Sequence, residues 1–156
     1  MAQNAIELLK ADHKKVRELL SQLVESTTRA EKKRRELLDK IEQELKVHTH
    51  IEEEIFYPAF KAAGNAEHKK MYFEALEEHR AVEALVLPDL KKTDPTSEKF
   101  SGRAKVLKEL VEHHADEEEE EMFKAARKAM SARQLEELGE QMQASKEKML
   151  RQLQAA

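Results

Sequence analysis

The stretch LDKIEQELKVHTHIEEEIFYPA, residues 38–59, indicates how this chain folds. Its apolar residues recur at steps of three and four, which is the period of one helix face. The face consists, in chain order, of Leu38, Ile41, Leu45, His48, Glu52, Ile55 and Ala59. A spacing of four puts His48 and Glu52 one turn apart on that face. We therefore expect a core-facing helix that carries an imidazole and a carboxylate into the interior.

The same pattern returns 66 residues later in the chain. This offset pairs Ile41 with Leu107, Leu45 with Val111, His48 with His114, Glu52 with Glu118, and Phe56 with Met122. An imidazole and a carboxylate that converge from one helical turn are typical ligands of a transition metal. Two such turns predict a binuclear metal site inside a helical bundle.

The composition favours helix along nearly the whole chain. Only 3 glycines and 3 prolines interrupt 156 residues, and 38% of the residues are charged. We expect helices over about 5–24, 30–57, 66–87, 103–130 and 131–153. The predicted fold class is all-α: an antiparallel up-down four-helix bundle with an additional C-terminal helix. Residues 1–156 are expected to form a single domain, with the bundle over about 5–130 and the C-terminal helix over about 131–154.

Each of the four expected bundle helices has a histidine near the middle of its apolar face. These histidines are His13, His48, His79 and His114. Alone, His13 is more typical of a core histidine bonded to backbone, but four histidines at one level indicate ligands. Glu52 and Glu118 strengthen this interpretation, because a buried carboxylate needs a cation and no lysine or arginine lies on either face.

Several neighbouring residues leave the ligand set open. Glu83 follows His79 by four residues and is a further candidate ligand, or else a solvated side chain. His113 competes with His114, and the 66-residue offset favours His114 paired with Glu118. His50 lies about 200° around the helix from His48 and is expected on the solvated face.

Other site types do not fit the sequence. The chain has no cysteine, so thiolate ligands, catalytic thiols and disulfides are excluded and the donors must be nitrogen and oxygen. The patterns His-Glu-x-x-His and Glu-x-x-His are absent, and no serine or threonine has a clear base partner. We therefore predict metal ligands and no separate catalytic or cofactor-binding residues.

The charge and hydropathy patterns indicate where the protein acts. The first residues lack the basic and apolar regions of a signal peptide, and no apolar run approaches the ~18 residues of a membrane span. The net charge of −4, with acidic and basic residues interleaved, argues against nucleic acid as the main partner. A cytoplasmic protein with no membrane partner is expected.

At this point the chain resembles a known family. The motifs are Asp12-His13, His48-x-x-x-Glu52 followed by EEIFYP, Glu78-His79, and His113-His114 before the acidic run. Together, over roughly residues 5–130, they resemble the hemerythrin-like family, also called the HHE cation-binding domain, in its bacterial stand-alone form. The resemblance implies two non-haem iron ions, bridged by carboxylates and a solvent-derived oxygen. It also implies ligands at His13, His48, Glu52, His79, His114 and Glu118, with the two glutamates as bridges.

Two departures from that family affect the expected function. Oxygen-carrying hemerythrins have a second histidine where this chain has Glu83, and an aspartate where it has Glu118. A more anionic ligand set favours ferric iron, and so favours redox, sensing or iron-handling roles over oxygen carriage.

We expect a protein that binds dioxygen or a similar small ligand and receives electrons from an unidentified reductant; it is more a binding protein than an enzyme. One alternative is an enzyme that decomposes peroxide or nitric oxide. The other is a metal-free helical interaction module in which the fifth helix forms a homodimer.

Overall fold

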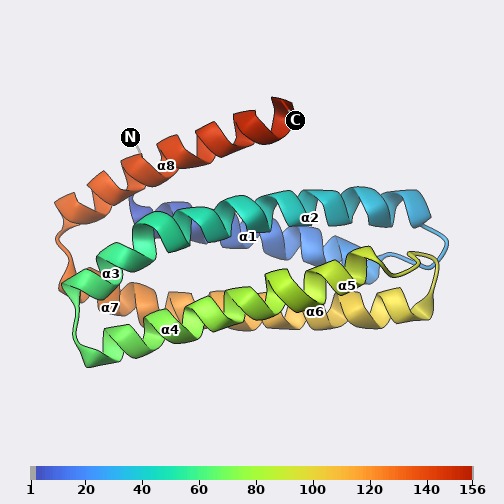
Figure 1. The fold of residues 1–156 in the computed structure, drawn as a ribbon, viewed down its shortest axis with the longest axis horizontal. Helices are drawn as coiled ribbons and strands as arrows, with labels where there is room; N and C mark the ends of the chain where they lie inside the picture. Colours follow the sequence, from blue (N-terminus) through green and yellow to red (C-terminus); the bar gives the residue numbers. More distant parts are fainter. Residues whose placement is uncertain (1–2, 156) are drawn as a thin grey trace.

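The computed structural model describes residues 3–155, which form five helical rods. The rods are, in chain order, α1 (Ala5–Glu25); α2 (Glu31–Ile51), η1 (Glu52–Phe56) and α3 (Tyr57–Ala63); α4 (Ala66–Arg80), η2 (Ala81–Val86) and α5 (Leu87–Lys91); α6 (Glu98–Glu117), η3 (Glu118–Met122) and α7 (Phe123–Ala129); and α8 (Ala132–Ala155). Figure 1 shows four rods of alternating direction side by side, with α8 lying along the outside of α1 and α2. The predicted up-down four-helix bundle with an additional C-terminal helix is confirmed.

Polar side chains cap the beginnings of three of the rods. Asn4 caps α1 through a reciprocal pair of hydrogen bonds with Glu7, and Asn65 caps α4. Ser97 accepts a hydrogen bond from the backbone amide of Phe100 and starts α6 at Glu98. The fourth rod therefore begins about five residues earlier than the sequence pattern predicts, because this cap shortens the expected loop.

Three rods contain a π-helical segment, in which each backbone amide bonds five residues back. These segments are η1, η2 and η3. Such widened turns occur frequently at functional sites. Pro58 and Pro88 are the second residues after η1 and η2, and neither ends its rod. The register change before each proline lets the rod continue past a residue that has no amide hydrogen to donate.

The apolar core is divided into two clusters along the bundle. One cluster includes Phe56, Phe60 and Phe123 near the α3 and α7 end, and the other includes Leu20, Ile41 and Leu107 toward the opposite end. Buried polar residues lie on the same rods and separate the two clusters. The interior is therefore two apolar blocks with a polar layer between them.

The fifth rod, α8, is packed on the bundle through a close backbone approach. Leu135 and Met142 are buried in the core, and a Cβ atom placed on Gly139 would come within 2.4 Å of the carbonyl oxygen of Gln3. Glycine is required here because no side chain fits between α8 and the start of α1.

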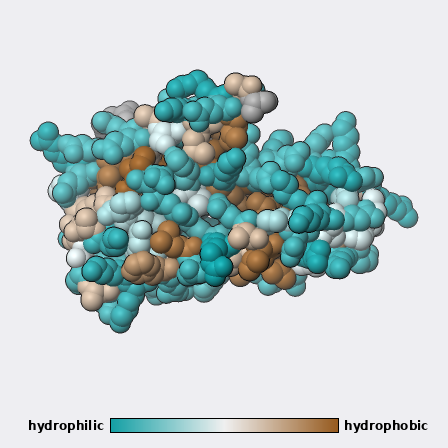
Figure 2. All heavy atoms as spheres, viewed as in Figure 1, coloured by the Kyte–Doolittle hydropathy of each residue, from teal (hydrophilic) through white to brown (hydrophobic). Residues whose placement is uncertain are grey.

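The surface is mostly hydrophilic. Figure 2 shows hydrophilic side chains over most of one face, interrupted by separate apolar patches. Phe73, Leu85 and Val106 are the large apolar side chains that are most exposed in the described chain. Within residues 3–155, no helix combines the length and the apolar character needed to cross a bilayer.

Candidate metal centre

The polar layer brings together one histidine from each of the four bundle rods. His13 comes from α1, His48 from α2, His79 from α4 and His114 from α6, and all four are buried. His113, in contrast, is 61% exposed. The structure therefore places His114, rather than His113, in the interior, where the 66-residue offset predicts it.

Two fully buried glutamates lie between these histidines. Glu52 Oε1 is 3.1 Å from Nε2 of both His48 and His79. Glu118 Oε1 is 3.1 Å from Nε2 of His114 and 3.2 Å from Nε2 of His13. Each carboxylate thus joins histidines of two different rods, which is the arrangement of a bridging ligand.

The buried potential ligand atoms form two clusters, and a third group, Glu78, His113 and Glu117, lies nearer the surface. His13, His48, Glu52 and Glu118 converge in one cluster, and Glu52, His79 and His114 converge in the other. We call them position 1 and position 2. Glu52 belongs to both, so the geometry provides two cation positions that share a carboxylate.

Four further carboxylates orient the histidine rings from outside. Each Nδ1–H donates to a carboxylate carried by another rod, and the pairs are His48 with Asp12 at 2.9 Å, His79 with Glu53 at 2.7 Å, His114 with Glu78 at 2.7 Å, and His13 with Glu119 at 2.8 Å. A carboxylate only accepts, so the hydrogen is held on Nδ1 and Nε2 is left as the metal-binding atom. Sequence reasoning did not assign these four roles, because each acid lies beside a ligand in sequence but serves a different rod.

Charge balance shows how the centre is held without metal. Burial lowers the pKa of His48, but the charge of Glu52 and the hydrogen bond to Asp12 outweigh burial and raise it to about 10. The pKa values of His13, His79 and His114 are also raised, against the opposing effect of burial, by their carboxylate partners. Burial raises the pKa of Glu118, whereas the charge and hydrogen bond of His114 lower it well below its usual range. The carboxylate partners thus favour the protonated form of each imidazole.

The hydrogen-bond pattern tests whether a metal fits. His48 Nε2 and Glu52 Oε2 are buried without any hydrogen-bond partner, although His48 Nε2 lies only 3.1 Å from Glu52 Oε1. The Nε2 atoms of His79 and His114 face each other at 3.1 Å. Buried polar atoms left in this way are rare in folded proteins. One unpartnered imidazole nitrogen, one unpartnered carboxylate oxygen and two imidazole nitrogens that face each other fit a pair of cations.

Tyr57 is a site residue that the sequence reasoning missed. Its hydroxyl donates to Glu118 Oε2 at 2.9 Å and lies 3.3 Å and 3.2 Å from Nε2 of His79 and His114. Tyr57 follows Glu52 by five residues, so the π-turn of η1 returns it to the face of Glu52. Phe123 has the same relation to Glu118 and stacks on the ring of His13. The 66-residue offset also pairs Tyr57 with Phe123, and this signal was available in the sequence.

Glu83, a predicted ligand, is not brought into either cluster. It is solvent-exposed and lies at the rim of the central cavity, near Thr49. The reason is the register of η2, which begins at Ala81, between His79 and Glu83. In the other two rods the widened turn begins at the glutamate itself, so the one-turn spacing from histidine is preserved.

A small cavity adjoins the four histidines. Its volume is about 40 Å³, and Val16, Leu45, Val82 and Val111 supply apolar walls. This exceeds the ~10–15 Å³ that one water needs, so a small molecule has room beside the ligands. Leu45 and Val111, which lie on the predicted apolar faces, line the cavity, whereas Leu76 packs in the neighbouring apolar cluster.

Comparison with known proteins identifies relatives of the whole helical unit. The family model of the hemerythrin HHE cation binding domain matches residues 4–126. A DNA nickase from a Nostoc species is 28% identical over 151 residues, but this chain spans only 41% of its length while 96% of this chain is covered. An uncharacterized protein of Mycobacterium tuberculosis is 32% identical over 147 residues, covering 94% of this chain and 87% of that protein.

A solved structure agrees with the fold. The crystal structure of a hemerythrin HHE cation binding domain-containing protein from Mycobacterium kansasii has a TM-score of 0.81 and 34% sequence identity. The match covers 94% of this chain and 87% of that chain. Converging histidines and glutamates, the match to the family model and this structural likeness agree, and the chain belongs to the hemerythrin HHE cation-binding domain family.

Proposed function

We propose that this protein holds two non-haem irons in the polar layer and binds dioxygen or a related small molecule in the adjoining cavity. The observation that supports it most is the placement of Glu52 and Glu118, which are 0% and 2% exposed and each lie between histidines of two rods. Two carboxylates in that environment require compensating positive charge.

The donor set favours iron among the cations. Four imidazoles and two bridging carboxylates are nitrogen and oxygen donors, and the chain has no thiolate to offer. Such ligands suit iron, and the anionic bridges favour its ferric state. A bound pair of irons would supply redox chemistry, with one electron available from each ion. The chemistry of the site therefore supports redox, sensing or iron-handling roles.

The protein's own residues would orient the ligands and limit access. Asp12, Glu53, Glu78 and Glu119 fix the four imidazole rings with Nε2 directed inward. The apolar cavity walls keep bulk water from the ligands and admit only small molecules. Tyr57 places a hydroxyl hydrogen beside position 2. The reductant, a homodimer and a cytoplasmic location stay predictions of the sequence.

Metal loading tests the proposal directly. Metal-free protein would be loaded anaerobically with ferrous iron, desalted and analysed for iron per chain, and its absorption spectrum would be recorded before and after exposure to air. We expect two irons per chain and new near-ultraviolet bands in air. Fewer than one iron per chain, or a spectrum with protein absorption alone, would contradict the proposal.

Paired variants separate the buried centre from the acidic surface. Glu52→Gln removes a carboxylate shared by both positions and should lower the stoichiometry below two. Glu54→Gln is the matched control, because Glu54 is exposed on the same π-turn and lies in neither cluster. Equal iron content in the two variants would show that loading occurs elsewhere.

A second candidate function is the decomposition of peroxide. The observation that favours it is Tyr57, a buried hydroxyl that can hold a proton at the centre. Consumption of peroxide by iron-loaded protein, measured for wild type and Tyr57→Phe, distinguishes turnover from simple binding. Turnover that falls in the variant while iron content is unchanged would favour the enzyme.

A further inference from the structure

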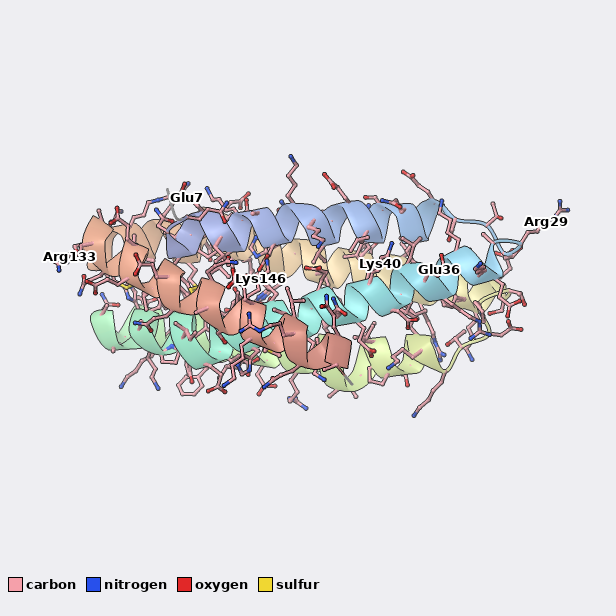
Figure 3. All side chains as sticks on the ribbon, turned by 90° about the horizontal axis from the view of Figure 1, so that it is seen from above. Glu7, Arg29, Glu36, Lys40, Arg133 and Lys146 are labelled. Atoms are coloured by element: carbon pink, nitrogen blue, oxygen red, sulfur yellow. The ribbon has the colours of Figure 1, made fainter. Side chains whose placement is uncertain are left out.

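The helix outside the bundle contacts a carboxylate of the metal centre through the side chain of Lys146. Lys146 of α8 donates from Nζ to Asp12 Oδ1 at 2.5 Å, and the other oxygen of Asp12 accepts from Nδ1 of His48. Figure 3, which labels Lys146, shows α8 crossing obliquely over the bundle. The two hydrogen bonds of Asp12 thus connect α8, α1 and α2.

The register of α8 directs Lys146 toward Asp12. Gly139 and Met142 fix how α8 lies on α1, because one allows backbone contact and the other is fully buried. Lys146 follows Met142 by one helical turn and so shares its face. Its Nζ reaches a carboxylate that is only about 5% exposed.

Asp12 needs this partner more than the other outer carboxylates do. Glu53, Glu78 and Glu119 are 35%, 23% and 26% exposed, so water also solvates them. Asp12 is buried, and an uncompensated buried charge is strongly destabilising. An imidazole that serves as a metal ligand is neutral, so it can donate to Asp12 but cannot balance its charge. Lys146 supplies that balance.

The same comparison shows that the two metal positions differ. At position 1, Lys146 backs Asp12 and Arg17 lies 3.3 Å from Glu119. At position 2, the ion-pair partners of Glu53 and Glu78 within residues 3–155 are all histidines. Fixed cations therefore support the ligands of only one position.

We propose that Lys146 is a positioning residue for position 1, because it holds Asp12 so that Asp12 fixes the ring of His48. This inference rests on the proposed metal function. Lys146 lies beyond residues 4–126, the part that matches the family model, so α8 adds a contribution of its own to the centre.

Stepwise metal affinity tests the inference. Metal-free protein would be titrated with cobalt(II) against a competing chelator, and the visible absorption would follow the two ions separately. Lys146→Met should raise one of the two dissociation constants on the order of tenfold. This is the lower end of the loss of affinity seen when a hydrogen-bond partner of a metal ligand is removed. Lys146→Arg should restore it. Lys148→Met is the matched control. Lys148 lies on the same helix two residues after Lys146, is exposed, and makes no ion pair in the described chain.

A double-mutant cycle and the melting temperature distinguish positioning from packing. In an Asp12→Asn background, Lys146→Met should add no further loss of affinity, because the charge that it balances is gone. If Lys146→Met lowers the melting temperature of metal-free protein but leaves both dissociation constants equal to those of Lys148→Met, the inference is wrong. A wild-type protein that binds no cobalt and no iron would overturn the proposed function as well, so the two failures can be told apart.

Discussion

The hydroxyl of Tyr57 lies among the candidate ligand atoms of position 2. It donates to Glu118 Oε2 at 2.9 Å and lies close to two imidazole nitrogens of position 2. In metal-free protein this hydrogen bond restrains the Glu118 carboxylate, whose other partners include His13 and His114. Tyr57 therefore contributes to stability before any metal binds.

Replacing Tyr57 with phenylalanine should destabilise the metal-free protein by about 2 kcal/mol, because a hydrogen bond to a charged group contributes roughly 1.5–3 kcal/mol. Urea denaturation in the presence of a chelator measures the change. Tyr72→Phe is the control, since the hydroxyl of Tyr72 makes no hydrogen bond in the part of the chain that the structure describes. Equal midpoints for the two variants would show that the Tyr57 contact carries no net energy.

The four buried histidines make the stability of metal-free protein depend on pH. Their folded-state pKa values lie above the ordinary 6.5, and that of His48 is about 10. A raised pKa contributes stability that is fully present below about pH 6.5 and is lost as pH rises toward the folded-state value. Unfolding free energies at pH 6, 7.5 and 9 with chelator should therefore decrease in that order. Flat or rising values would mean that the imidazoles are neutral in the folded protein.

At the scale of single elements, the π-turns decide which residues reach the centre. The one-turn spacing of His48 with Glu52 and of His114 with Glu118 was predictable, because both pairs lie in regular α-helix up to the glutamate. Spacing did not point to Tyr57, and it made Glu83 a candidate ligand although Glu83 lies outside the buried clusters, because an α-helical period was applied across widened turns. Nothing in the local pattern of η2 marks where its register changes, and packing against the other rods determines it.

The register of η2 leads to a prediction about Glu83. Glu83→Gln should leave two metal ions per chain, because the side chain lies outside both clusters in the described chain. Metal analysis of purified, loaded protein measures the stoichiometry, with Glu52→Gln as the variant that should lose metal. Loss of one ion from Glu83→Gln would show that η2 rearranges when metal binds.

At the scale of the whole molecule, one buried arginine holds the end of the bundle opposite α3 and α7. The Arg34 guanidinium donates to the carbonyl oxygens of Ser26 and Pro95 and to the hydroxyl of Ser101, and it lies over the ring of Phe100. It thus joins the α1–α2 connection to the segment before α6. This role was not predictable, since Arg34 lies among other basic residues at the start of a helix.

Arg34→Met should lower the free energy of unfolding by about 3 kcal/mol, because it leaves buried carbonyl groups without donors. Thermal or urea denaturation measures the loss. Arg35→Met is the control, since Arg35 is exposed and pairs only with Glu31 in the described chain. A comparable loss in both variants would indicate a general effect of charge rather than the Arg34 contacts.

Metal binding should stabilise the entire fold. A ligand that binds only the native state stabilises it by about 2.7 kcal/mol at a hundredfold excess over its dissociation constant. A shift of the melting temperature that rises with metal concentration, and that is smaller in Glu52→Gln, would confirm the link. An unchanged melting temperature at saturation would contradict it.

The polar layer between the two apolar clusters also affects how long the protein resists degradation. Apolar contacts stabilise the two ends of the bundle, whereas the polar layer between them depends on paired charges. Without ions, deuterium should enter the amides around Glu52 and Glu118 before it enters those of either half, because local opening begins where apolar contact is sparse. Proteases cut chains that open. The supply of metal should therefore affect the lifetime of this protein, since the metal-free form should open, and be cut, more readily.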